Sequence, residues 1–178
     1  MNWKHFKFND VVYYLNHLHP QRKIFEQAAK GDKPALQYKV DVIFGLHCFT
    51  RGIKADEVID DQLLYSDSRE SRVFDFQRYE LSKQLPAIVE TLVTRKCSHS
   101  GKGNFFTIEL LTAEQQIVQY EVFFEVSRST QKGVLNLFVQ SAYVRDDKHR
   151  SNTPKKKPIS FLVILHNIQN NKPIKIQT

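Results

Sequence analysis

The residues best suited to chemistry are arginines and histidines that stand where predicted strands end. Arg128 ends the run QIVQYEVFFEVSR, and Arg145, His149 and Arg150 follow the apolar run GVLNLFVQSAYV. Histidine gives or takes a proton near neutral pH, and the arginine guanidinium binds two phosphate oxygens at once. These residue types suit metal-free cleavage of RNA, in which the 2′-hydroxyl attacks and cations stabilise the developing charge.

The predicted pairing of these two strands separates the candidates into two clusters. The runs are joined by the turn-like stretch STQKG, which predicts a hairpin with Arg128 and Lys132 at its turn. Arg145 and His149 then lie at the other end of the second strand. Because one pocket cannot hold residues from both ends, we expect one cluster at each end of the sheet.

The other histidines near strand ends are open to a plainer interpretation. His47 and Arg51 follow an earlier strand, His99 lies in a turn, and His166 ends the run FLVILH. A single histidine in such a place is more often solvated or a cap than an acid or base. The alternative to catalysis is therefore a surface that binds nucleic acid and cleaves nothing.

The segment 143–158, YVRDDKHRSNTPKKKP, is a basic arm that follows an apolar strand. It is interrupted by proline and followed by another apolar run, which favours an anion-facing arm over a targeting tag. A turn rich in hydrogen-bond donors, GKGN at 101–104, adds a further cation. The residues that we expect to contact nucleic acid are Lys102, Lys132, Lys148, Arg150, Lys155, Lys156 and Lys157.

The positive charge is concentrated in the second half of the chain. Residues 1–89 hold 13 Lys and Arg against 12 Asp and Glu, whereas residues 90–178 hold 13 against 7, for a net charge of +7. This asymmetry indicates a partner with dense negative charge, RNA before DNA. A membrane surface is disfavoured because the cations form no amphipathic helix. The alternatives are a solubilising face and a protein partner docked by the acid-rich 56–70 loop and the 145–157 arm.

The common motifs of metal and cofactor chemistry are not matched. His47-Cys48 and Cys97-Ser98-His99 carry zinc-type ligands, but neighbouring strand residues point to opposite faces and no C-x-x-C pair is present. The stretch SHSGKGNFF is no phosphate loop of the P-loop kind, because it opens a strand. No G-x-S-x-G is present. We therefore expect neither a metal nor a cofactor.

Size and composition predict one soluble domain. The 178 residues are 41% hydrophobic, with 6 Gly and 6 Pro, which suits a folded chain with one core. No apolar run reaches the roughly 20 residues of a membrane helix, and the N-terminus lacks a signal-peptide core. Only 2 cysteines are present, so a disulfide framework is not indicated and we expect a cytoplasmic setting.

Local patterns predict helices first and strands afterwards. VVYYLNHL (11–18), capped by Asn9 or Asp10, QRKIFEQAAK (21–30), ended by Gly31, and SKQLPAIVETLVTRK (82–96) are the predicted helices. YKVDVIFGLHC (38–48) alternates apolar and polar residues, which predicts a half-buried strand. Later strands are predicted at 103–112, 116–128, 133–145 and 158–167, with a short fifth at 172–177.

The predicted fold class is therefore α+β. N-terminal helices and a strand precede a helix that packs on a four- to five-stranded antiparallel sheet. Residues 1–178 form a single domain, with a subdivision into residues 1–72 and 73–178 as the alternative.

Two resemblances accompany this interpretation. The block GNFFTIELL…YEVFFEVSRS…GVLNLFVQSAYVRD resembles the sheet of barnase- and RelE-type ribonucleases, in which helices precede a four-stranded antiparallel sheet. That resemblance implies a metal-independent ribonuclease of toxin or defence type, with site residues at Arg128, Tyr143, Arg145 and His149. The run 73–175 also resembles a family of bacterial proteins through HCFTR, GNFF, SAYVRD and KKKP, which implies no particular activity.

Overall fold

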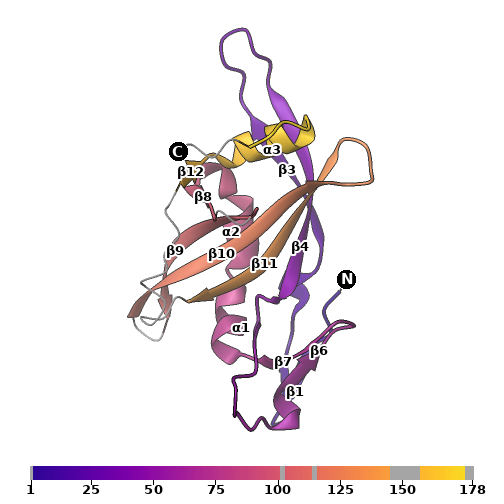
Figure 1. The fold of residues 1–178 in the computed structure, drawn as a ribbon, viewed down its shortest axis with the longest axis vertical. Helices are drawn as coiled ribbons and strands as arrows, with labels where there is room; N and C mark the ends of the chain where they lie inside the picture. The colour runs from indigo at the N-terminus through magenta and orange to yellow at the C-terminus, as the bar shows by residue number, and fades with distance from the viewer. Residues whose placement is uncertain (1, 101–102, 114–115, 145–156, 175–178) are drawn as a thin grey trace.

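A seven-stranded sheet organises the molecule (Figure 1). The structure is a computed structural model that describes residues 2–100, 103–113, 116–144 and 157–174. In spatial order the strands are β12 (Lys157–Ile159), β8 (Cys97–His99), β9 (Phe105–Ala113), β10 (Gln116–Arg128), β11 (Val134–Val144), β4 (Leu36–His47) and β3 (Gln21–Gln27). All neighbours are antiparallel except β11 and β4, which run parallel.

The α+β prediction is wrong, because the described chain is mostly β and its main sheet is mixed. A hairpin of β1 (Phe6–Phe8) and β2 (Val11–Tyr13) and the strand β3 occupy the place of the two expected N-terminal helices. Asn9 and Asp10 have φ of 46° and 60°, so they form a left-handed two-residue turn between β1 and β2. Asn and Asp favour such turns as well as helix caps, and here the turn prevails.

A second, smaller sheet and three short 3₁₀ turns complete the described part of the fold. A second sheet has the order β5 (Thr50–Arg51), β7 (Ser71–Phe74) and β6 (Leu64–Ser66). Short 3₁₀ turns, η1 (Asn16–Leu18), η2 (Asp61–Leu63) and η3 (Leu92–Thr94), connect larger elements. Figure 1 shows this second sheet at the opposite end from the β3–β4 and β10–β11 hairpins.

The predicted helix at 82–96 is divided in the structure. α1 (Phe76–Ser82) begins earlier, because the Asp75 side chain accepts the Arg78 backbone N–H as an N-cap. Ser82 therefore ends a helix, although it was expected to begin one. α2 (Leu85–Glu90) has Pro86 in its first turn, where the missing N–H of proline costs nothing.

The expected strand at 158–167 is also wrong in most of its length. Only β12 is a strand, and α3 (Phe161–Gln169) follows it. Phe161, Ile164 and Leu165 are buried, and their spacing of three and four residues is that of one helix face. The run is rich in β-branched residues, which explains the wrong prediction. No strand is present at 172–174, the described part of the expected fifth strand.

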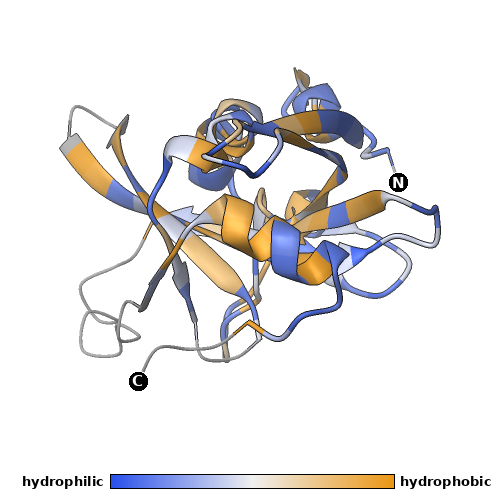
Figure 2. Ribbon diagram, turned by 90° about the horizontal axis from the view of Figure 1, so that it is seen from above, coloured by the Kyte–Doolittle hydropathy of each residue, from blue (hydrophilic) through white to orange (hydrophobic). Residues whose placement is uncertain are grey.

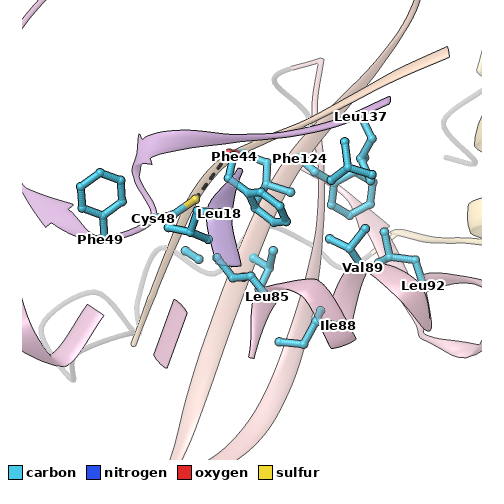
Figure 3. Packing of buried hydrophobic residues seen from close by; sticks show 14 of the residues in the cluster. Leu18, Phe44, Cys48, Phe49, Leu85, Ile88, Val89, Leu92, Phe124 and Leu137 are labelled. Atoms are coloured by element: carbon cyan, nitrogen blue, oxygen red, sulfur yellow. Dashed lines mark hydrogen bonds between the residues drawn. The ribbon is translucent and has the colours of Figure 1, made fainter. Parts of the chain in front are cut away.

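The core lies between one face of the main sheet and the helices. One cluster of buried hydrophobic residues extends from Trp3 to Leu165. Figure 3 shows Leu85, Ile88, Val89 and Leu92 opposite Phe44, Phe124 and Leu137 of the sheet. α3 packs on the same face, where Phe161 contacts the rings of Phe25 and Phe124.

The strands predicted from alternation are confirmed. In β4, Tyr38, Val40, Val42 and Phe44 are buried while the residues between them are more exposed. Figure 2 shows the corresponding alternation of hydrophobic and hydrophilic residues along the strands. Within the described residues, no helix is long and apolar enough to cross a membrane.

Candidate functional site

The turn of the β10–β11 hairpin lines a pocket of about 600 Å³. This pocket, called the hairpin pocket below, combines two cations with hydroxyl and amide side chains. The last residue of α3 closes one side of it. The lining residues are Arg128, Ser129, Thr130, Gln131, Lys132, Gly133, Val134, Leu135 and Gln169.

Backbone hydrogen bonds within the turn shape the pocket. The Ser129 backbone N–H donates to the Val134 carbonyl at 3.0 Å, and the Val134 N–H donates to the Gln131 carbonyl at 3.2 Å. Gly133 has φ of +76°, a left-handed conformation that side chains rarely adopt. The sequence STQKG therefore folds into a compact five-residue turn, as its glycine and polar residues predict.

Arg22, which lies in the edge strand β3, connects that strand to this turn. Its guanidinium donates to both carboxylate oxygens of Asp41 at 2.7 and 2.9 Å, and to the Gln131 side-chain oxygen at 2.9 Å. The hydrogen bond from Arg22 lowers the pKa of the Asp41 carboxyl below its ordinary value. Because Asp41 neutralises Arg22, Arg22 positions Gln131 and adds no net charge to the pocket.

Arg128 and Lys132 are the charged side chains of the pocket. Neither forms an ion pair with any residue that the structure describes. Among described acceptors, none receives the backbone N–H of Thr130, Lys132 or Gly133. The pocket therefore offers positive charge and free hydrogen-bond donors, which is the chemistry of an anion site.

Tyr143, a further predicted site residue, lies at the opposite end of the same hairpin from Arg128. The register pairs Arg128 with Leu135 and Glu121 with Tyr143. Arg128 lies seven positions after Glu121 in β10, or about 24 Å at 3.4 Å per residue. Arg128 and Tyr143 therefore lie toward different ends of the hairpin.

Tyr143 is covered by an arginine that the sequence did not single out for this role. The guanidinium carbon of Arg78 lies 5.3 Å from the centre of the Tyr143 ring. Arg78 also donates to the backbone carbonyls of His47 at 3.2 Å and Thr50 at 2.8 Å. Burial lowers the pKa of Arg78 from its ordinary value, although nearby Asp75 opposes this. These contacts hold the end of β4 against α1 and β11.

His47 takes part in a polar network at that end. The His47 Nε2 atom lies 2.8 Å from one carboxylate oxygen of Glu70. The other carboxylate oxygen of Glu70 accepts a hydrogen bond from the Arg72 guanidinium at 3.1 Å. The hydrogen bond to His47, followed by that from Arg72, lowers the pKa of Glu70. Arg72 in turn donates to the Thr50 hydroxyl. The parallel pairing of β11 with β4 places His47 opposite Ser141, two residues before Tyr143.

Most of the predicted basic arm lies outside the described residues. Lys157 begins β12 and pairs in register with His99. Seven other predicted site residues lie outside the described residues: Lys102, Arg145, Lys148, His149, Arg150, Lys155 and Lys156.

The two cysteines are buried and separate. Burial raises the pKa of Cys48 to about 12 and that of Cys97 to about 12. The Cys48 thiol donates to the Val139 carbonyl at 3.5 Å (Figure 3). Within the described residues, no group of three or more His, Cys, Asp or Glu side chains is arranged to hold a metal.

Sequence reasoning found the two cations of the hairpin pocket and its turn but missed Gln169 and the contact from Arg22. The turn-like sequence STQKG predicted that Arg128 and Lys132 lie together at a hairpin turn. Gln169 carried no usable signal, because it lies between the predicted strands at 158–167 and 172–177. Arg22 was assigned to a helix, and its contact with Gln131 spans 109 residues.

Comparisons with known proteins identify relatives in sequence. The YjaZ family profile matches residues 5–169. Protein YjaZ of Escherichia coli (strain K12) is 30% identical to the chain over 162 residues, which are 90% of this chain and 86% of that protein. No solved structure matches significantly, and nothing supports the resemblance to barnase- and RelE-type ribonucleases. The resemblance to a bacterial family is supported, and the chain belongs to the YjaZ family.

Proposed function

We propose that this protein binds single-stranded nucleic acid, RNA before DNA, through the end of the sheet that carries the hairpin pocket. One observation carries the proposal. Arg128 and Lys132 line a concave surface and have no acidic partner among the described residues. Phosphate groups supply the charge that such a surface lacks.

The adjacent β3–β4 hairpin extends the positive surface. Lys30, Lys33 and Lys39 are exposed there, and Lys39 is paired in register with Val134 of the pocket. Both hairpins project from the same end of the sheet (Figure 1). A flexible polyanion contacts such a surface at several phosphates, and each contact releases counterions.

The packing of the helices favours a single strand over a duplex. Direct reading of a duplex commonly inserts a helix into the major groove. In the described part of the chain, the three α-helices are short, and all three contribute to the hydrophobic core. The hairpins, by contrast, are accessible and narrow, which suits contact with a single strand.

The described lining of the hairpin pocket supports binding. Metal-free cleavage of RNA needs a group that takes the 2′-hydroxyl proton and one that protonates the leaving oxygen. The lining of the hairpin pocket contains no histidine or carboxylate among its described residues. Its cations and amides bind phosphate without supplying either proton transfer.

The test measures the affinity of labelled single-stranded RNA, single-stranded DNA and duplex by fluorescence anisotropy over a range of salt concentrations. We expect RNA to bind most tightly and the affinity to fall with salt. Arg128→Ala and Lys132→Ala should each reduce the slope of log K against log salt by about one.

Lys54→Ala is the matched control, because it removes one exposed cation from the loop after β5, away from the hairpins. This variant should keep the slope of the unmodified protein. Absence of salt-dependent binding, or equal effects of all three substitutions, would refute the proposal. Salt-insensitive association with a protein would point to the interaction-protein alternative.

A further inference from the structure

We propose that the hairpin pocket captures a phosphate monoester, the group that terminates a phosphorylated strand, in preference to the diester phosphates within the strand. The inference rests on the function proposed above, and it specifies which part of the nucleic acid enters the pocket. Charge, hydrogen bonding and shape each support it.

The charge of the pocket matches a monoester. A phosphate monoester carries about −1.5 to −2 charges near pH 7, because its second pKa is about 6. A diester inside the backbone carries a single charge. Arg128 and Lys132 together bring two positive charges, and Arg22 adds none because Asp41 neutralises it. Two cations around one pocket, neither paired with an acid among the described residues, fit the more highly charged group.

The donors of the turn match three terminal oxygens. A monoester presents three oxygens that accept strong hydrogen bonds, one more than a diester. The backbone N–H groups of Thr130, Lys132 and Gly133, which no described acceptor receives, belong to one turn. The Ser129 hydroxyl accepts from the Gln131 backbone N–H at 3.2 Å, which leaves its own O–H available to donate.

The shape of the pocket favours a strand end. Its volume of about 600 Å³ lies within the range of small-ligand pockets and exceeds what a phosphate alone fills. Its lining consists of residues 128–135 and Gln169. A terminal phosphate enters the pocket with a sugar attached on one side only, whereas an internal phosphate must enter with sugars attached on both sides.

The experiment compares three single-stranded RNAs of the same sequence with the unmodified protein. One carries a 5′-phosphate, one a 3′-phosphate, and one has hydroxyl groups at both ends. We expect at least one phosphorylated strand to bind roughly 10- to 100-fold more tightly than the hydroxyl strand, as charge-assisted hydrogen bonds allow. This comparison does not depend on whether a variant folds.

Substitutions in the pocket then test whether the preference for a phosphorylated strand end depends on its two cations. Arg128→Ala/Lys132→Ala should abolish the preference for a phosphorylated end. Lys30→Ala/Lys33→Ala is the matched control, because it removes two exposed cations of the β3–β4 hairpin that do not line the pocket. The control should weaken all three RNAs equally and keep the preference.

The outcomes separate the inference from the proposed function. Equal binding of the three RNAs, weakened by the pocket substitutions, would overturn the inference and leave the function standing. A nucleoside monophosphate that binds in the pocket while no RNA binds would support monoester recognition and refute nucleic-acid binding. Binding of neither RNA nor mononucleotide would overturn both.

Discussion

At the scale of single residues, the buried hydroxyl of Tyr120 lowers the stability of the folded protein. Tyr120 is fully buried in the core, and its hydroxyl has no hydrogen-bond partner among the described residues. A buried hydroxyl that loses its water without a replacement destabilises the folded state by about 1–3 kcal/mol. Burial raises the pKa of this phenol, as expected for a group in apolar surroundings.

We predict that Tyr120→Phe keeps or raises the free energy of unfolding, by up to about 1 kcal/mol. Tyr38→Phe is the matched control, since the Tyr38 hydroxyl donates to Gln27 at 3.1 Å. That control should lower the free energy of unfolding by about 1 kcal/mol. Urea unfolding of the two variants measures both changes. An equal loss in both would show that the Tyr120 hydroxyl does have a partner.

At the scale of elements, the parallel contact between β11 and β4 joins the two halves of the chain. It is the one parallel pair among the described strands of the main sheet. A glycine in β4 makes the contact close. A Cβ built on Gly45 would lie 2.8 Å from the Gln140 backbone oxygen and 3.2 Å from that of Val139. Backbone atoms held in a sheet cannot move aside cheaply.

We therefore predict that Gly45→Ala lowers the free energy of unfolding by about 2–3 kcal/mol, an overpacking effect in a well-packed core. Gly52→Ala is the control, because its nearest neighbour, the Arg72 guanidinium, lies 4.0 Å away. That substitution should leave stability unchanged or slightly raised. Thermal and urea unfolding distinguish the two. A neutral Gly45→Ala would mean that the β4–β11 contact is looser than described.

At the scale of the whole molecule, the two buried thiols make stability depend on alkaline pH. Cys48 follows β4 and Cys97 lies in β8, so both ends of the core contribute. Burial raises the pKa of each thiol from 9.0 to about 12, and Glu109 adds to the effect at Cys97. Above pH 9 the unfolded chain loses protons that the folded chain retains. Stability is therefore complete below pH 9 and falls between pH 9 and 12.

We predict a decrease of up to about 1.4 kcal/mol per pH unit for each thiol in that range. Urea unfolding at a series of pH values measures the slope. Cys48→Ala/Cys97→Ala, compared with its own value at pH 8, should show a shallower slope. An unchanged slope would exclude the thiols as its origin. The native thiols should also react with a thiol reagent only after unfolding.

Local patterns in the sequence determined the central strands. Alternation specified β4, and apolar runs separated by turn residues specified β9, β10 and β11, because a strand buries every second side chain whichever neighbour it pairs with. The same turn predicted that Arg128 and Lys132 lie together. Composition and charge determined the general character of the surface.

Tertiary structure decided what local pattern leaves ambiguous. Asn9 and Asp10 suit a helix cap or a hairpin turn, and packing selected the hairpin. The run at 161–169 suits a strand or a helix, and its burial at Phe161 against the sheet selected α3. Most of the lining of the hairpin pocket is the contiguous segment 128–135, but Gln169 and the Arg22 side chain that contacts Gln131 come from distant segments. Their meeting depends on contacts between distant residues, which local periodicity does not encode.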